Sequence, residues 1–476
     1  MKRRLRIYKK TVSIVNETAT AMYENLVGDH KGFLLESYDK NYDRYTFFGR
    51  EPEEIISSRG NALVITKNDG SEDVREGNPL QLLKEYYSEF DIVKDNEELS
   101  FSGGLVGNLG YDFVRYAEVL PDDNPDEIGI ETIQMMLMTK FIMVDHIAET
   151  LTGIILGEDT EEGKKKSLEE AEELIEKARN GADQVNPKNF VHDGVIIHQS
   201  DDLAQYSKKV EKIKEYIREG HIFQTVLSQR WTVQTAQSGF ELYKELRELN
   251  PSPYLYYFNY GDFEVIGSSP EMIVKQQGNH VYTCPIAGTR PRGADAEEDA
   301  LLRDELLQDE KERAEHVMLV DLARNDMGRI SEFGTVKVTQ FMEVQNYSHV
   351  MHIVSMVEGR KKGEFHPLDL ISSFLPAGTL SGAPKIRAME IIDELENVKR
   401  GLYGGATGYI DFSGDMDFCI TIRTMIKKGD KVYLQAGAGI VADSVPENEY
   451  QECCNKVMAL AKTLIHTSGF QRKLDM

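Results

Sequence analysis

Apolar and polar positions alternate along residues 1 to about 155 with the period of β-strands. Short apolar runs such as FLLES (33–37), NALVITK (61–67) and LMTKFIMVDHI (137–147) are separated by turns rich in Asn, Asp and Gly. This pattern predicts antiparallel strands, because successive side chains of a strand point to opposite faces. The segment near 79–90 follows a helical period and predicts one helix within this region.

A charge-rich amphipathic stretch at 157–187 predicts a long helix bounded by polar turns. We expect it to be the linker between an N-terminal regulatory or structural region, residues 1–187, and a C-terminal catalytic domain, residues 188–476. The two parts are expected to interlock, since a chain of this length can share one large core.

A second helix is predicted to begin with Ser200 or Asp201 as its N-cap and to end at Gly220. Its apolar positions recur at spacings of three and four, as on one helix face; they are Leu203, Tyr206, Val210, Ile213 and Ile217.

The remaining segments mix strands and helices. Strands are predicted at 222–234, 254–283 and 405–440, and helices near 297–327, 385–396 and 447–466. Runs of strands with interspersed helices, in place of strict βαβ alternation, predict an α+β fold with mostly antiparallel sheets.

The charge balance narrows the classes of partner. Of 476 residues, 55 are Lys or Arg and 80 are Asp or Glu, which gives a net charge of −25. This excess argues against nucleic acid or an anionic membrane as a partner. No apolar run approaches the roughly 20 residues of a membrane span, and the basic start leads into polar sequence instead of an export signal. We expect a cytoplasmic protein with reduced, packed cysteines, which are Cys284, Cys419, Cys453 and Cys454.

Four glycine-containing strings in the C-terminal half suggest a ligand cradle. They are CPIAGTRPRG (284–293), HVMLVDLARNDMGR (316–329), GTLSGAPK (378–385) and QAGAGIVADSVPE (435–447). Glycines allow tight turns and close approach of the backbone to a ligand. Each string alone is more often an ordinary turn, and none matches a phosphate-loop or dinucleotide signature. Their combination is what points to a binding site.

Acidic residues on two predicted helices are candidate metal ligands. Glu315 lies in one helix, and Glu449 and Glu452 share a face of the last helix because they are three positions apart. Mg²⁺ is usually held by only one or two protein carboxylates, with water and an anionic substrate completing its shell. The alternative is a solvated helix face on which Glu452 pairs with Lys456.

The four strings, in this order, resemble the chorismate-utilising enzymes, and among them the large subunits of anthranilate synthases. The resemblance extends from about Ser200 to Ala461, with weaker similarity before it. It implies two facing, mostly antiparallel sheets flanked by helices, with the active site in the cleft between them. It also implies that chorismate and ammonia give anthranilate and pyruvate, the first step of tryptophan biosynthesis, with Mg²⁺ required.

Two positions separate the reactions within this family. Members that add water have a lysine base where this chain has Gln224, and an uncharged amide cannot activate water. Aminodeoxychorismate synthases commonly have a lysine nucleophile in PIKGT, where this chain has Ala287. The resemblance therefore favours direct amination beside the ring carboxylate. An aminodeoxychorismate synthase component I is the alternative, since some of those enzymes lack the lysine and both residues here can simply pack.

The resemblance assigns further roles. Glu315 and Glu452 would hold Mg²⁺, Glu271 would be the acid that protonates the departing hydroxyl, and His352 would be the base for pyruvate loss. Structural roles, as a surface carboxylate and a core histidine, are the alternatives for the latter two. The implied substrate-binding residues are Gly288, Thr289, Thr379, Tyr403, Arg423, Gly437 and Gly439.

Control and ammonia supply also follow from the resemblance. LLES and NPSPYL resemble the two parts of a tryptophan feedback site, whose residues here would be Leu35, Glu36, Ser37, Pro253, Tyr254 and Leu255. A strand end and a proline-rich turn are the alternative for these segments. No cysteine lies in a glutaminase nucleophile elbow, so a separate glutamine amidotransferase subunit is expected. A catalytically inactive, tryptophan-binding regulatory subunit is the alternative from another class of function.

Overall fold

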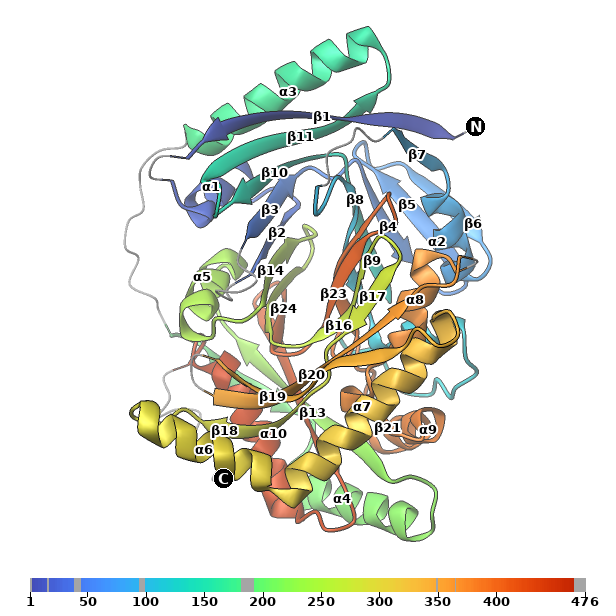
Figure 1. The fold of residues 1–476 in the computed structure, drawn as a ribbon, viewed down its shortest axis with the longest axis vertical. Coiled ribbons are helices and arrows are strands. Elements are labelled where there is room, and N and C mark those ends of the chain that lie inside the picture. Colours follow the sequence, from blue (N-terminus) through green and yellow to red (C-terminus); the bar gives the residue numbers. More distant parts are fainter. Residues whose placement is uncertain are drawn as a thin grey trace.

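The protein folds around two large β-sheets in a computed structural model. The structure describes residues 2–14, 17–37, 44–93, 99–180, 192–347, 350–363 and 365–465. Figure 1 shows helices flanking the sheets. Almost all strand pairs are antiparallel, and β1 with β7 is a parallel pair. The predicted α+β class with two mostly antiparallel sheets is confirmed.

In the part of the chain that the structure describes, the first sheet has thirteen strands. In spatial order they are β12 (Val195–Gln199), β13 (Gln224–Gln234), β25 (Lys431–Ile440), β24 (Thr424–Lys428), β15 (Glu264–Ser269), β14 (Tyr254–Asn259), β2 (Gly32–Glu36), β3 (Tyr45–Arg50), β10 (Lys140–Asp145), β11 (Thr150–Glu158), β1 (Arg3–Ser13) and β7 (Phe90–Val93), and β21 (Gly382–Ala383) pairs with β13.

The second sheet has twelve strands among the described residues. In spatial order they are β18 (Ile286–Pro291), β20 (Val350–Arg360), β17 (His280–Thr283), β16 (Met272–Gln277), β23 (Met416–Ile420), β22 (Ala406–Asp411), β8 (Gly104–Leu109), β9 (Ile133–Met138), β4 (Glu54–Ser58), β5 (Ala62–Lys67) and β6 (Glu72–Glu76), and β19 (Lys337–Asn346) pairs with β20. Both sheets contain strands from before residue 180 and after residue 192. The predicted boundary at 187/188 lies outside the described residues.

Helices cover the outer faces. On the first sheet they are α1 (Ala19–Leu26), α3 (Glu161–Arg179), α4 (Leu203–Arg218), α5 (Gly239–Leu249), α9 (Lys385–Leu395) and α10 (Pro446–Ala461). On the second they are α2 (Pro79–Tyr87), α7 (Glu310–Ile330) and α8 (Pro367–Phe374). Helix α6 (Ala296–Gln308) packs on β18–β20, and two short 3₁₀ helices, η1 (Tyr111–Tyr116) and η2 (Gly378–Leu380), lie in connections. None of the described helices is long and apolar enough to cross a membrane.

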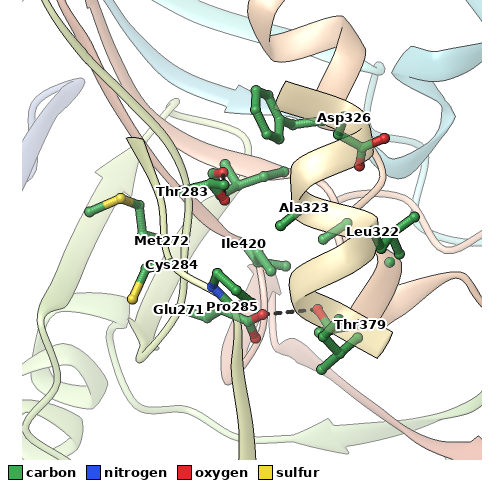
Figure 2. Close-up of a pocket in the computed structure, with 15 residues that line it drawn as sticks. Glu271, Met272, Thr283, Cys284, Pro285, Leu322, Ala323, Asp326, Thr379 and Ile420 are labelled. Carbon is green, nitrogen blue, oxygen red and sulfur yellow. Dashed lines mark hydrogen bonds between the residues drawn. The ribbon is translucent and has the colours of Figure 1, made fainter. Parts of the chain in front are cut away.

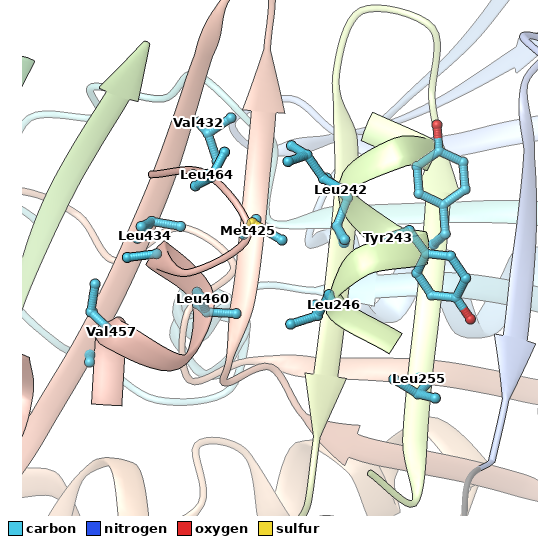
Figure 3. Packing of buried hydrophobic residues seen from close by; sticks show 14 of the residues in the cluster. Leu242, Tyr243, Leu246, Leu255, Met425, Val432, Leu434, Val457, Leu460 and Leu464 are labelled. Carbon is cyan, nitrogen blue, oxygen red and sulfur yellow. The ribbon is translucent and has the colours of Figure 1, made fainter. Parts of the chain in front are cut away.

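Three apolar layers hold the molecule together. One lies between the first sheet and its helices, where Leu242 and Leu246 of α5 pack near Leu434 of β25 and Leu460 of α10 (Figure 3). A second lies under α2, α7 and α8, and a third joins the facing surfaces of the two sheets. Each fully buried leucine contributes roughly 1.5–3 kcal/mol relative to exposure. The layer between the sheets therefore makes the two sheets one unit.

Two sequence expectations need correction. The N-cap of α4 is Asp202, whose side chain accepts a hydrogen bond from the backbone N–H of Gln205 at 2.8 Å. In return, the backbone N–H of Asp202 donates to Oε1 of Gln205 at 2.9 Å. Ser200 and Asp201 are engaged elsewhere, since Asp201 pairs with Lys209 at 2.6 Å. Tyr206, Val210 and Ile213 are buried as predicted, whereas Leu203 is exposed and Ile217 is only partly buried.

The helix expected to act as a linker is part of the packed structure. Helix α3 covers β11, and its small residue Ala171 is so close that a Cβ on Gly153 would lie 2.6 Å from the Ala171 carbonyl oxygen. Its buried positions are Ser167, Ala171, Ile175 and Ala178. The stretch that connects it to β12, residues 181–191, lies outside the described residues.

Candidate active site

Glu271 lies between β15 and β16 and is partly buried. The hydroxyl of Thr379 donates to its Oε1 at 3.0 Å, as Figure 2 shows. Burial raises the pKa of Glu271 to about 7, although Thr379, Lys456 and Arg423 each act to lower it. Near neutral pH a substantial share of this carboxyl carries a proton. The group therefore suits a general acid.

His352 lies on β20 and is buried. Its Nδ1 is 2.9 Å from the carbonyl oxygen of Gly288 and 3.0 Å from the hydroxyl of Thr289. Burial and the positive charge of Arg423 lower the pKa of His352. Because a carbonyl can only accept, Nδ1 carries the proton and donates it to Gly288. Nε2 is then the basic nitrogen.

A β-bulge creates the carbonyl contact to His352. The pairing of β18 with β20 shifts register between Ala287 and Thr289, and Gly288 between them has a φ of +70°. A residue with a side chain is strained in this left-handed region, so glycine suits this position. Glu312 of α7 lies behind the bulge, since a Cβ on Gly288 would lie 3.2 Å from its Oε2.

Arg423 precedes β24 in a strained backbone conformation with a φ of +48°. Burial lowers its pKa, while the charges of Glu271 and Tyr347 raise it. Within the described residues its guanidinium has no hydrogen bond or ion pair to another side chain. A partly buried arginine in this state has a planar set of donors available for a carboxylate.

The ends of β13 and β25 form another wall. Val226 faces Gly439 and Ser228 faces Gly437 in the antiparallel register. The side chain of Gln224 lies against Gly439, because a Cβ there would be 3.0 Å from its Nε2. Gln224 is 5% exposed, and among the described residues its Oε1 has no hydrogen-bond partner. The wall thus presents glycine backbone and a buried amide oxygen with unused accepting capacity.

Tyr403 lies on the same side of the site as this wall. It is buried, and its hydroxyl oxygen accepts a hydrogen bond from the backbone N–H of Gly437, which acts to lower the pKa of Tyr403. Burial raises the pKa of Tyr403 above its usual range. The hydroxyl therefore stays protonated and can donate a hydrogen bond.

Carboxylates of α7 and α10 face each other beside this wall. Burial and the charges of Glu312 and Glu452 raise the pKa of Glu315, and burial and Glu452 raise that of Glu449. The ion pair of the alternative interpretation is present, since Lys456 lies 2.7 Å from Glu452 and the two side chains are 48% and 47% exposed. Lys456 further donates to the carbonyl oxygen of Gly437 at 3.0 Å, and its charge acts on Glu271. The acidic cluster therefore adjoins the residues described above.

The carboxylates fit a divalent cation with few protein ligands. The described residues contain no group of three or more His, Cys, Asp or Glu side chains arranged to hold a metal. Burial first, and then the charges of Glu312 and Glu452, raise the pKa of Glu315, and a bound cation would favour its ionised form. Mg²⁺ needs only one or two such carboxylates when a substrate anion completes its shell.

A small cavity of about 50 Å³ lies beside Glu271, and a second cavity of about 180 Å³ lies between the sheets. The residues that line it include all six predicted effector residues, Leu35, Glu36, Ser37, Pro253, Tyr254 and Leu255. The pairing of β2 with β14, with Leu255 opposite Glu36, brings the two sequence motifs together. The carboxylate of Glu36, however, accepts hydrogen bonds from Tyr243 and Arg247 of α5.

The two cavities share walls. Met272 and Cys284 line both the second cavity and a smaller one of about 50 Å³ beside Glu271 (Figure 2). Tyr347 lines the second cavity, and its ring centroid is 5.3 Å from that of His352. A ligand between the sheets would therefore contact side chains that also border the candidate active site.

Every sequence-predicted site residue is thus placed, and two neighbours were missed. A Cβ on Gly288 would contact the Glu312 carboxylate, and the ring of Tyr347 packs against that of His352. The spacing of Glu312 and Glu315, three positions apart on one helix, was a usable signal. The contact between Lys456 and Gly437 joins different elements and had no local signal.

The family described as chorismate binding enzyme matches residues 34–462. The chain belongs to the chorismate-binding enzyme family. The match begins much earlier than the segment from Ser200 on which the sequence resemblance rested. It therefore includes β2 and most of both sheets.

Named relatives cover nearly the whole of this family member. It is 45% identical over 458 residues to the anthranilate synthase component 1 of Acetivibrio thermocellus, covering 94% of this chain and 93% of that protein. It is 42% identical over 464 residues to that of Bacillus subtilis strain 168, covering 93% and 89%.

Solved structures agree with the fold. The anthranilate synthase component I of Streptococcus pneumoniae TIGR4 superimposes with a TM-score of 0.77 at 39% identity, covering 88% of this chain and 92% of that one. The menaquinone-specific isochorismate synthase of Escherichia coli gives 0.73 at 18% identity, covering 97% and 95%. The latter is similar in fold alone.

The raised pKa of Glu271 predicts a trade of stability against function in this chorismate-binding enzyme. The folded-state pKa of about 7 exceeds the ordinary value of 4.5, so folding opposes ionisation. The free energy of unfolding then falls as pH rises from 4.5 to 7 and stays lower above 7. Glu271→Gln should be more stable than the wild type at pH 8 by up to about 3 kcal/mol, yet lose activity. Urea unfolding at pH 5 and pH 8 checks this, and an equal difference at both values would contradict it.

Proposed function

We propose that this enzyme converts chorismate and ammonia to anthranilate and pyruvate, the first step of tryptophan biosynthesis. The observation that carries the proposal is the buried side chain of Gln224 at the wall of the site, an uncharged amide that cannot activate water. Ala287 likewise offers no lysine nucleophile in β18. The names of the 39–45% identical relatives support the same reaction.

Amination is the first chemical step. The nitrogen of ammonia bonds to the ring carbon beside the carboxylate, the ring double bonds shift, and the bond to the hydroxyl oxygen breaks. Protonated Glu271 gives that oxygen its proton, so that the hydroxyl leaves as water. The hydrogen bond from Thr379 holds Oε1 of Glu271 in place. A pKa of about 7 makes the proton available near neutral pH.

Elimination follows at the aminated carbon. Nε2 of His352 removes the proton there, the bond to the enolpyruvyl oxygen breaks, pyruvate leaves, and the ring becomes aromatic. The lowered pKa keeps His352 neutral and able to accept. Donation from Nδ1 to the Gly288 carbonyl fixes the ring orientation.

Substrate binding uses the remaining wall. Arg423 would hold the enolpyruvyl carboxylate through its forked donors, with the N–H groups of Gly437 and Gly439 beside it. Gly288, Thr289, Thr379 and Tyr403 would complete the pocket through backbone and hydroxyl groups. Glu315 and Glu452 would hold Mg²⁺, which supplies positive charge for the ring carboxylate when bound.

Ammonia is expected to come from a separate glutamine amidotransferase subunit. All four cysteines are free, and burial raises the pKa of Cys284 and Cys453 to about 12 and that of Cys454 to about 11, and also raises that of Cys419. None is therefore a ready thiolate for glutamine hydrolysis. The component 1 names of the relatives also support a second component.

We also propose that tryptophan binds the cavity between the sheets and inhibits the enzyme. Ser37→Phe should abolish this inhibition and leave uninhibited turnover largely intact, because the ring would fill space beside a buried hydroxyl that has no partner among the described residues. Ser37→Ala is the matched control and should keep the cavity open. Calorimetry and initial rates with tryptophan check the prediction.

The two sites should also be coupled in both directions. By reciprocity, chorismate should weaken tryptophan binding by the same factor by which tryptophan weakens chorismate binding. Full tryptophan sensitivity of Ser37→Phe would refute the assignment of this cavity.

The direct test of the reaction is product identification with chorismate, Mg²⁺ and ammonium at mildly alkaline pH. Fluorescent anthranilate and pyruvate are expected in equal amounts. Glutamine should replace ammonium only when the amidotransferase subunit is added. Accumulation of 4-amino-4-deoxychorismate would instead support the aminodeoxychorismate synthase alternative.

A further inference from the structure

A buried ion pair lies behind the candidate active site and has no part in the mechanism above. Arg400 is 2% exposed and Glu396 is 5% exposed. Nε of Arg400 donates to Oε2 of Glu396 at 2.8 Å, and Nη2 donates to Oε1 at 2.6 Å. Such a two-bond pair fixes the plane of the guanidinium.

The other donors of Arg400 reach backbone of two site segments. Nη1 donates to the carbonyl oxygen of Leu380 at 2.6 Å, directly after Thr379, which holds Glu271. Nη2 donates to the carbonyl oxygen of Val226 at 2.8 Å, two residues beyond Gln224 on β13. One guanidinium thus ties the turn that orients the proposed acid to the strand that carries the buried amide.

The pair has two more contacts on the same side. The Arg400 guanidinium carbon is 5.7 Å from the ring centroid of Tyr403, a proposed substrate contact. Oε1 of Glu396 accepts from both the N–H and the hydroxyl of Ser228, each at 2.8 Å. Ser228 faces Gly437 across the β13–β25 pairing. Both members of the ion pair therefore brace segments that carry proposed site residues.

We infer that Arg400, held by Glu396, is a positioning residue that fixes the 378–382 turn, β13 and Tyr403 relative to one another. It touches no reacting atom in this arrangement. Its contribution rests on the proposed function, because correct placement of Thr379 and Glu271 matters only if Glu271 acts as the acid. Displacement of a catalytic group by about 1 Å can cost roughly 100-fold in rate.

Arg400→Lys is the test variant. Lysine keeps the charge but cannot donate in the planar fork that reaches Glu396, Leu380 and Val226 together. The expected result is a roughly 10- to 100-fold fall in kcat for anthranilate formation. Loosening of the Thr379 hydrogen bond should also raise the pKa of Glu271 and move the alkaline limb of the kcat/KM profile to higher pH. Arg423, Lys456 and the Cys284 thiol, which also face Glu271, are unchanged in this variant.

Arg230→Lys is the matched control. Arg230 is equally buried on β13, but it donates to Gln435 and to the Lys399 carbonyl oxygen, and it is linked to Glu396 indirectly, through Gln435 and Ser228. It should lose thermal stability while kcat and the alkaline limb stay near wild type. Glu396→Gln is a second test variant and should show the same fall in kcat and the same shift of the alkaline limb as Arg400→Lys. If Arg400→Lys does not fold, the result for Glu396→Gln tests the positioning role.

The outcomes separate the inference from the proposed function. Equal losses of kcat in Arg400→Lys, Glu396→Gln and Arg230→Lys, with the alkaline limb in place, would overturn the positioning role. A wild-type protein that forms no anthranilate would instead overturn the proposed function, before any variant is compared.

Discussion

Glu315→Gln and Glu452→Gln are each expected to abolish most of the activity while the fold survives. A neutral amide loses the charge that a hard cation requires, and the proposed ligand set has only these two carboxylates. The loss should exceed the roughly 10- to 100-fold that follows removal of a metal ligand's hydrogen-bond partner. Initial rates across a Mg²⁺ titration, with thermal unfolding to verify the fold, check this.

Glu449→Gln is the control for these two variants. Glu449 lies three positions before Glu452 on α10, and its pKa is raised by burial and by Glu452. As it is not a proposed ligand, its replacement should leave the Mg²⁺ response near that of the wild type. A Glu452→Gln enzyme with normal rate and normal Mg²⁺ response would show that the metal assignment at that residue is wrong.

His352→Met is expected to stop the reaction after amination. Glu271 serves as the acid of the first step, so chorismate should still be consumed and 2-amino-2-deoxyisochorismate should accumulate. Anthranilate formation should fall by roughly 10²- to 10⁴-fold, the usual contribution of a general base. Liquid chromatography with mass detection follows both species.

Thr289→Val is the milder comparison for His352→Met. It removes the hydroxyl 3.0 Å from Nδ1 of His352 but leaves the contact of Nδ1 with the Gly288 carbonyl. Formation of anthranilate and pyruvate should therefore slow, and 2-amino-2-deoxyisochorismate should not accumulate. If folded His352→Met protein consumed no chorismate, His352 would have to act before elimination or serve the structure.

Local pattern was sufficient for much of the fold and for the two motifs that line the cavity between the sheets. Strand periodicity and turn residues predicted the antiparallel elements, since these depend on neighbours in the sequence. The motifs around Ser37 and Tyr254 line one cavity because β2 pairs with β14. A motif carries such information when its residues share a strand end or a turn.

Contacts between distant elements were beyond sequence reasoning. The carboxylate of Glu36 is held by Tyr243 and Arg247, more than 200 positions away, and nothing near LLES indicates this. The Arg400–Glu396 pair was missed for a related reason. Its spacing of four is visible, but burial and the bonds to Leu380 and Val226 depend on the packing of α9 against β13.

The whole catalytic set also bears on the alternative of an inactive tryptophan-binding subunit. A binding module gains nothing from a carboxyl with a raised pKa held by Thr379, or from a neutral histidine oriented by a carbonyl. Both features cost stability, because they place polar groups in buried positions. Their presence together supports catalysis.

The central claim is that ammonia, not water, attacks the ring carbon beside the carboxylate. The most direct measurement is turnover of chorismate with ¹⁵N-ammonium in ¹⁸O-water, followed by mass analysis of every ring product. The account predicts that anthranilate carries ¹⁵N on the carbon next to the carboxylate and that no ring product carries ¹⁸O. An ¹⁸O-labelled isochorismate, or ¹⁵N at the carbon opposite the carboxylate, would contradict it.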